Sequence, residues 1–116
     1  MIIGIGVDVV QISRFDRQLI RTPSLLDHLF SPEEQVSHAL PLAAHFAAKE
    51  AIVKAVGAPA GLDWLDCQVL VEVGGLPRVS IMGSIAAVAA IKGINSWHLS
   101  MSQEGDLAIA MVIAEK

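Results

Sequence analysis

The chain has 116 residues, of which 53% are hydrophobic and only 17% are charged. This length fits one domain over residues 1–116 and is too short for two ordinary domains. A typical soluble domain has about 25% charged residues and a small domain needs polar cover, so this surface is unusually apolar. Either part of this surface is buried against another subunit or the chain is unusually insoluble, and the first alternative points to an oligomer.

The composition excludes several classes of protein. The longest apolar run, 107–114, has eight residues, far fewer than the roughly 20 that a membrane span needs. The single cysteine cannot form an internal disulfide, and no Cys/His spacing resembles a zinc site. With 8 Lys+Arg against 12 Asp+Glu, there is no general basic field for nucleic acid. We therefore expect a cytoplasmic protein without a signal peptide that binds neither nucleic acid nor a membrane.

Three residues between positions 31 and 34 together indicate the start of a helix. Ser31 can cap the helix, Pro32 suits its first position, and Glu34 completes a capping box. Pro41 should end this helix, because proline cannot continue one. A longer and mostly apolar helix is expected over 42–56.

Hydrophobic periodicity and turn residues predict the other elements. The expected strands are residues 2–10, 67–73, 78–82, 97–102 and 107–114, with a turn over 103–106. The expected helices are residues 12–22, the short helix that follows Ser31, 42–56 and 84–92, the last two stopped by Gly57 and Gly93. This order predicts an α+β fold in which a mixed or antiparallel sheet packs on helices.

Asp8 is the first candidate for chemistry. Alternation along a strand places it on the same face as Gly4 and Gly6, which have no side chains. A carboxylate on an otherwise apolar strand requires a cation or strong hydrogen-bond donors, because its burial without a partner is costly. The structural alternative is that Asp8 ends the strand and caps the following turn.

Glu50 and Lys54 are the second candidates. They share one face of the predicted helix over 42–56 with Ala43 and Ala47, whose small side chains allow a backbone or ligand to approach. The alternative is an exposed ion pair one turn apart, worth a few tenths of a kcal/mol.

Taken together, these residues favour phosphoryl-transfer chemistry. Mg²⁺ typically takes one or two protein carboxylates and completes its shell with water and phosphate oxygens, which suits Asp8 and Glu50. Lys54 would then neutralise charge on the same phosphate. In such sites the protein mainly positions groups and stabilises charge.

Three arginines form the third feature. Arg14, Arg17 and Arg21 lie within a narrow arc of the first predicted helix, opposite its apolar residues. The alternative is an ordinary solvated face. In an acidic and charge-poor chain, however, this clustering favours a docking surface for an acidic partner.

The remaining side chains of chemical interest are interpreted as structural. His28 and His38 are typical of surface or capping positions, and His98 faces away from the core residues beside it. Cys67 opens a valine-rich strand, where a small core residue fits.

Two motifs resemble those of a known enzyme family. Residues 4–8, Gly-Ile-Gly-Val-Asp, are followed at the proper distance by residues 46–54, Phe-Ala-Ala-Lys-Glu-Ala-Ile-Val-Lys. The pair resembles the motifs of the 4′-phosphopantetheinyl transferases, and the short chain resembles the holo-[acyl-carrier-protein] synthase branch. The resemblance extends through residues 31–34 and 75–78 to the closing strand pair, and so covers nearly the whole chain.

This resemblance implies a reaction, an assembly and a site. The reaction transfers the phosphopantetheine arm of coenzyme A to a serine of apo acyl carrier protein and releases adenosine 3′,5′-bisphosphate. The assembly is a homotrimer with the site between subunits. The implied catalytic residues are Asp8, Glu50 and Lys54, with Mg²⁺ held by Asp8 and Glu50. The implied coenzyme A contacts are His45, Lys49, Lys54, Gly57, Gly61 and Pro77. The implied contacts with the acidic carrier protein are Arg14, Arg17 and Arg21.

Several positions depart from the family pattern. Histidine replaces the usual arginine at His45, leucine replaces a lysine at Leu76, and glutamine replaces a frequent histidine at Gln103. The loop over 57–61 also differs. Because cations are lost, two other functions stay open. One is a carrier-protein-binding module with weakened catalysis, and the other is a Mg²⁺-dependent nucleotide phosphohydrolase that uses the same carboxylates.

Overall fold

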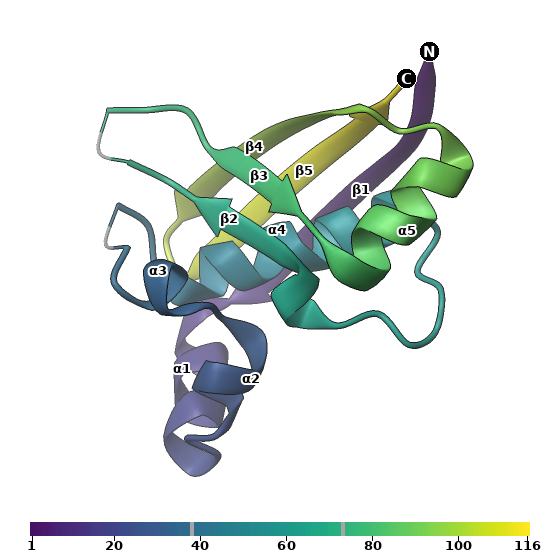
Figure 1. Ribbon diagram of the computed structural model, residues 1–116. Coiled ribbons are helices and arrows are strands. Elements are labelled where there is room, and N and C mark those ends of the chain that lie inside the picture. The colour runs from purple at the N-terminus through teal and green to yellow at the C-terminus, as the bar shows by residue number, and fades with distance from the viewer. Residues whose placement is uncertain (38, 73) are drawn as a thin grey trace.

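The computed structural model describes residues 1–37, 39–72 and 74–116 (Figure 1). The interpretation of His38 and the expected strand end at Val73 lie outside these residues. The strands are β1 (Ile2–Gln11), β2 (Cys67–Leu70), β3 (Arg78–Ile81), β4 (Ser96–Glu104) and β5 (Leu107–Glu115). The helices are α1 (Ile12–Arg21), α2 (Leu25–Leu29), α3 (Pro32–Gln35), α4 (Leu42–Ala55) and α5 (Gly83–Lys92), with a 3₁₀ helix, η1 (Trp64–Asp66).

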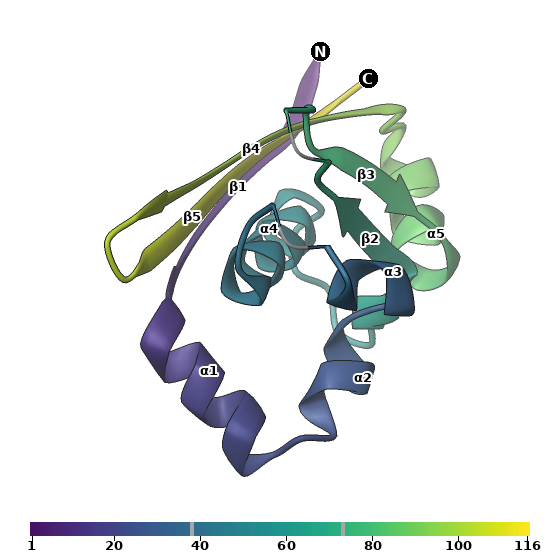
Figure 2. The ribbon, with the colours of Figure 1, turned by 90° about the vertical axis from the view of Figure 1, so that its left-hand side faces the viewer.

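The strands form two antiparallel sheets with α4 between them. One sheet has three strands in the order β1-β5-β4, and the other is the hairpin of β2 and β3. Figure 2 shows α4 enclosed between these sheets, while α1 and α2 extend from the body on one side. This arrangement confirms the expected α+β fold. Among the described helices, none is long and apolar enough to cross a membrane.

The inner face of the three-stranded sheet is built from small residues. On β5 these are Ala108, Ala110, Val112 and Ala114, all buried. On β1 the glycines are essential, because a Cβ at Gly4 or Gly6 would overlap the carbonyl oxygen of Ala55 or Ala51 on α4. The close approach of the two backbones is therefore made by the glycines of β1 against Ala51 and Ala55, and not by the predicted Ala43 and Ala47, and α4 lies directly on β1.

The outer face of the same sheet is apolar and open. The side chains of Ile5, Val7 and Val9 on β1 are each more than half exposed, at 59%, 53% and 56%. Their partners on β5 include Met111, which is also exposed. Part of the apolar surplus seen in the composition thus lies together on one face of one sheet, while other exposed apolar side chains, such as Ile20, Leu76 and Ile91, lie elsewhere.

The structure differs from the sequence prediction in several places. The helix that follows Ser31 ends at Gln35, so Pro41 does not end it and instead stands at the N-cap of α4. The structure also contains a helix, α2, that the sequence pattern does not predict, and Ser24 at its N-cap makes no capping hydrogen bond with its side chain. The strand that starts at Cys67 ends at Leu70, before the expected end. The expected turn over 103–106 narrows to Gly105 and Asp106, because β4 continues to Glu104.

Candidate functional site

Three side chains predicted to act together do meet in the structure. Lys54 Nζ donates a hydrogen bond to Asp8 Oδ1 at 2.9 Å and another to the carbonyl oxygen of Val7 at 3.1 Å. Glu50 lines the same cavity as Asp8 and is close enough for the two carboxyl groups to interact. The Asp8 side chain is only 12% exposed, whereas that of Lys54 is 50% exposed. The site thus pairs two carboxylates and leaves the lysine partly in solvent.

The backbone explains why these groups converge. Gly4 and Gly6 bring β1 against α4, and Asp8 is the next residue on the same strand face. Glu50 and Lys54 are one helical turn apart and therefore point from α4 in the same direction. Asp8 of β1 therefore meets Glu50 and Lys54 of α4 just beyond the close contact that the two glycines make.

The electrostatics of the pair favour a cation. Burial raises the pKa of Glu50, and the nearby Asp8 charge raises it further, while Lys54 opposes the rise. The hydrogen bond to Asp8 in turn raises the pKa of Lys54. Two carboxylates that repel each other are stabilised together by a positive charge, and Lys54 supplies one such charge.

A cavity of about 410 Å³ opens beside the carboxylates. Its lining includes Asp8 and Glu50 together with Arg14 and Phe15 of α1. The first arginine of the basic cluster therefore borders the same space as the carboxylates. Arg14, Arg17 and Arg21 are all exposed, as both a docking face and an ordinary solvated face require.

A second cavity of about 360 Å³ continues from the first along α1. Both cavities share Phe15, Gln18 and Phe46. The second is mainly apolar, and we call it the α1 groove; its lining is Phe15, Gln18, Arg21, Thr22, Leu25, Leu29, Phe46 and Trp64. The phenyl ring of Phe46 stacks on Phe15 and touches Trp64, with ring centroids 5.0 and 5.4 Å apart.

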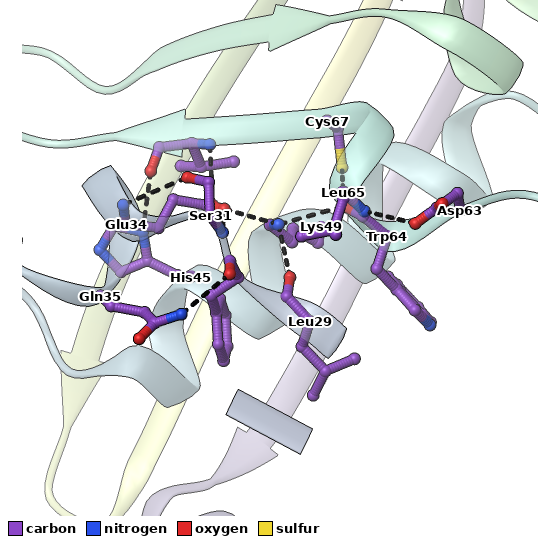
Figure 3. A network of polar contacts seen from close by, with 12 residues as sticks. Leu29, Ser31, Glu34, Gln35, His45, Lys49, Asp63, Trp64, Leu65 and Cys67 are labelled. Carbon is purple, nitrogen blue, oxygen red and sulfur yellow. Dashed lines mark hydrogen bonds and ion pairs between the residues drawn. The ribbon is translucent and has the colours of Figure 1, made fainter. Parts of the chain in front are cut away.

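The structure does not bring Lys49 to the predicted coenzyme A site. Its side chain is fully buried, and Nζ is bound to Glu34 Oε1 at 2.7 Å, to the Leu29 carbonyl at 2.6 Å and to the Trp64 carbonyl at 3.1 Å (Figure 3). An ammonium group has three donors, so none is free for a ligand. Glu34, which was predicted only as half of a capping box, is the partner that sequence reasoning missed.

His45 is also buried rather than facing a ligand. Its Nδ1 donates to the carbonyl oxygen of Val69 at 2.9 Å, and burial lowers the pKa of the imidazole (Figure 3). An uncharged and covered ring does not replace the arginine usual at this position in the family. The structure thus places both His45 and Lys49 in the interior, away from the expected phosphate contacts.

The other residues predicted to contact coenzyme A lie on exposed loops. Gly57 and Gly61 follow α4 with φ of +90° and +84°, and Pro77 precedes β3. None of these three lines the cavity beside the carboxylates. Within the described residues, no group of three or more His, Cys, Asp or Glu side chains converges, so the carboxylate pair is not part of a larger cluster.

The residues interpreted as structural keep that interpretation. His98 Nε2 lies 2.9 Å from Glu115 Oε1 on the outer face of the sheet, and His28 is exposed on α2. Cys67 is buried in the core, where its environment raises the pKa of the thiol to about 12.

Comparison with known proteins identifies the family. Residues 4–112 match the family model of the 4′-phosphopantetheinyl transferase superfamily. The chain belongs to this superfamily. A holo-[acyl-carrier-protein] synthase of Renibacterium salmoninarum is 56% identical over 115 residues, which are 99% of each chain.

Solved structures of the superfamily share the fold over the whole chain. The crystal structure of the holo-[acyl-carrier-protein] synthase from Neisseria meningitidis has a TM-score of 0.87 and 32% identity, and covers 100% of both chains. The Helicobacter pylori synthase in complex with coenzyme A has a TM-score of 0.82 and 28% identity, and covers 96% of this chain and 99% of that one. The resemblance inferred from the two motifs is confirmed.

Proposed function

We propose that the chain is a holo-[acyl-carrier-protein] synthase, which transfers 4′-phosphopantetheine from coenzyme A to a serine of apo acyl carrier protein. The convergence of Asp8, Glu50 and Lys54 beside an open cavity, in a member of this superfamily, is the observation that carries the proposal. The serine oxygen forms a bond to the phosphorus that bears the pantetheine arm. The pyrophosphate bridge breaks, adenosine 3′,5′-bisphosphate leaves, and the proton of the serine passes to a carboxylate of the Asp8 and Glu50 pair.

The carboxylate pair fits a Mg²⁺ ion. Asp8 and Glu50 offer oxygen ligands on one side only, which leaves the other positions of an octahedron to water and phosphate oxygens. Burial raises the pKa of Glu50 and the charge of Asp8 raises it further, and a divalent cation would relieve the repulsion between the two carboxylates. When bound, the ion would supply positive charge to the pyrophosphate.

Lys54 is suited to the phosphate that is transferred. Its ammonium group is anchored to Asp8 and the Val7 carbonyl yet half exposed, so its remaining donor can bind a phosphate oxygen beside the carboxylate pair. Charge that develops on the oxygen of the leaving group would be stabilised there without large movement of the protein.

The partner would dock on α1. Arg14, Arg17 and Arg21 present positive charge to an acidic carrier protein, and Arg14 borders the carboxylate cavity. The α1 groove, with Arg21 in its lining, adds apolar area next to these charges. A carrier bound here would place its serine near Asp8 and Glu50.

The assembly that we propose is a homotrimer. The open apolar face of β1 and β5 supports association, because such a patch on a small domain typically marks an interface. Gly57, Gly61 and Pro77 do not line the carboxylate cavity of their own chain, which fits a coenzyme A site shared between subunits. The free thiol of Cys67 fits a reducing compartment, and we propose that the enzyme acts in the cytoplasm.

One assay tests the proposal against its alternatives. The purified protein is incubated with coenzyme A, Mg²⁺ and apo acyl carrier protein, and the carrier is weighed by mass spectrometry. A phosphopantetheine mass gain on the carrier supports transfer. A stable complex without the gain would instead indicate a binding module, and breakdown of coenzyme A in the absence of carrier would indicate a phosphohydrolase.

A further inference from the structure

Lys49 of α4 is at the centre of a buried polar network that joins α4 to α2, α3, η1 and β2. Its Nζ contacts Glu34 of α3 and the backbone carbonyls of Leu29 and Trp64 (Figure 3). Glu34 is fully buried too, and its Oε2 accepts a hydrogen bond from Val69 N of β2 at 3.0 Å. Every donor of the ammonium group and both oxygens of the carboxylate are therefore satisfied by the protein.

The two carbonyl groups bound by Lys49 belong to Leu29 and Trp64. The side chains of these two residues both line the α1 groove. Leu29 ends α2 and Trp64 begins η1, and these elements contact each other although 35 positions of sequence separate the two residues. A single ammonium group thus fixes the relative position of two short elements that form one wall.

We propose that Lys49 is a positioning residue that sets the shape of the α1 groove and thereby the affinity for the carrier protein. The inference rests on the proposed function, because it takes the carrier as the occupant of the groove. The positive charge of Arg21 in the lining, and the continuity of the groove with the carboxylate cavity, favour an acidic partner there.

The chemistry of the network explains the choice of residues. A short helix such as α2 leaves carbonyl oxygens at its end without partners, and a buried carbonyl must find a donor. A lysine provides donors to several carbonyls at once, but its charge is costly to bury alone. Glu34 compensates that charge, and its capping box with Ser31 holds it in place. Glu34 thus makes it possible to bury the positive charge of Lys49, while Lys49 holds α2 and η1 together as one wall of the α1 groove.

The test uses a variant that removes both charges together, Glu34→Gln/Lys49→Met, since a single unpaired buried charge could prevent folding. The control Glu33→Gln/Lys116→Met removes the same charges from exposed positions. Two quantities are measured. One is the KM for each substrate, and the other is the fluorescence of Trp64 in a Trp97→Phe background, where Trp64 is the only tryptophan.

In the Glu34→Gln/Lys49→Met variant we expect the carrier KM to rise about tenfold, with kcat and the coenzyme A KM unchanged. Trp64 emission should shift to longer wavelength as the wall loosens.

Two results would overturn the inference. Carrier KM and Trp64 emission equal to those of the control would show that Lys49 only stabilises the fold. A rise in the coenzyme A KM alone would assign Lys49 to the other substrate. If the unmodified protein transfers no phosphopantetheine, the proposed function fails, yet Trp64 emission still decides whether Lys49 positions the wall.

Discussion

Gly6 lies directly against the carbonyl oxygen of Ala51, with no room for a side-chain carbon between them. This contact sets the distance between β1 and α4, and hence the distance between Asp8 and Glu50. A residue without chemistry of its own thus determines the geometry of the carboxylate pair.

Substitution Gly6→Ala should therefore damage both stability and activity. The added methyl group forces α4 away from β1, and overpacking of this kind typically costs about 1–3 kcal/mol. Chemical denaturation measures the loss of stability, and phosphopantetheine transfer at saturating substrate measures the displacement of Glu50. The control Gly75→Ala adds a methyl group where only ordinary contacts are present. Full activity of Gly6→Ala would show that the contact is not critical.

Glu50→Gln should abolish transfer and leave the fold intact. The change removes one proposed ligand of Mg²⁺ and the repulsion between two carboxylates. Because the pKa of Glu50 is raised in the folded state, its charged form opposes folding at neutral pH, and the amide should be at least as stable. Thermal unfolding and the mass-spectrometric assay measure the two effects. Retained activity together with retained Mg²⁺ binding would refute the proposed ligand.

Arg14→Glu should weaken use of the carrier protein much more than binding of coenzyme A. The side chain is exposed at the mouth of the carboxylate cavity, where an acidic partner would meet it. We expect the carrier KM to rise about tenfold at low salt and the difference to shrink as salt is added. Lys116→Glu makes the same charge change at the end of the chain. Equal effects of Arg14→Glu on both substrates would contradict docking on α1.

The start of α1 should lose its cap in acid. Asp106, in the turn between β4 and β5, accepts hydrogen bonds from Ser13 N at 3.0 Å and from Ser13 Oγ at 2.6 Å. These bonds lower the pKa of Asp106, so the cap stabilises α1 above the unfolded value of about 4 and is lost as pH falls through the lower folded value.

Thermal unfolding of the wild type and of Asp106→Asn tests this sign. The wild type should have the higher Tm at pH 7, and the two proteins should converge as the pH falls through the lowered pKa of Asp106 in the folded state. A difference in Tm that persists unchanged in acid would mean that the charge of Asp106 contributes nothing to the cap.

Cys67 should resist alkylation while the protein is folded. Burial raises the pKa of its thiol to about 12, so almost no thiolate is present at pH 8. Iodoacetamide and mass spectrometry should detect no adduct in buffer and complete labelling in denaturant. Rapid labelling under native conditions would indicate that β2 opens readily.

Local patterns were sufficient to predict the carboxylate pair. Asp8 and Glu50 stand out because each is a charged residue on an apolar element, and strand alternation and helix spacing fix the direction of each. Ser31 and Glu34 form the predicted capping box, because its two hydrogen bonds lie within one turn of chain.

Contacts between distant segments could not be predicted in this way. In the sequence, Lys49 cannot be distinguished from a lysine on the exposed face of a helix. Only the folded chain brings Glu34 and two backbone carbonyl groups around it. The cap of α1 is supplied by Asp106 from the other end of the sequence. Such partners depend on the order of the strands in the sheet, and the hydrophobic periodicity of the sequence does not specify that order.

The pairing of β1 with β5 has a consequence for folding. The Met1 ammonium group donates to the Lys116 carbonyl at 2.8 Å, and β1 pairs with β5 along its length. Asp8 is the pairing partner of Ala110, so it has no strand beside it until two segments far apart in the sequence have met. Closing such a long loop is slow, and the carboxylate pair therefore reaches its final geometry late in folding.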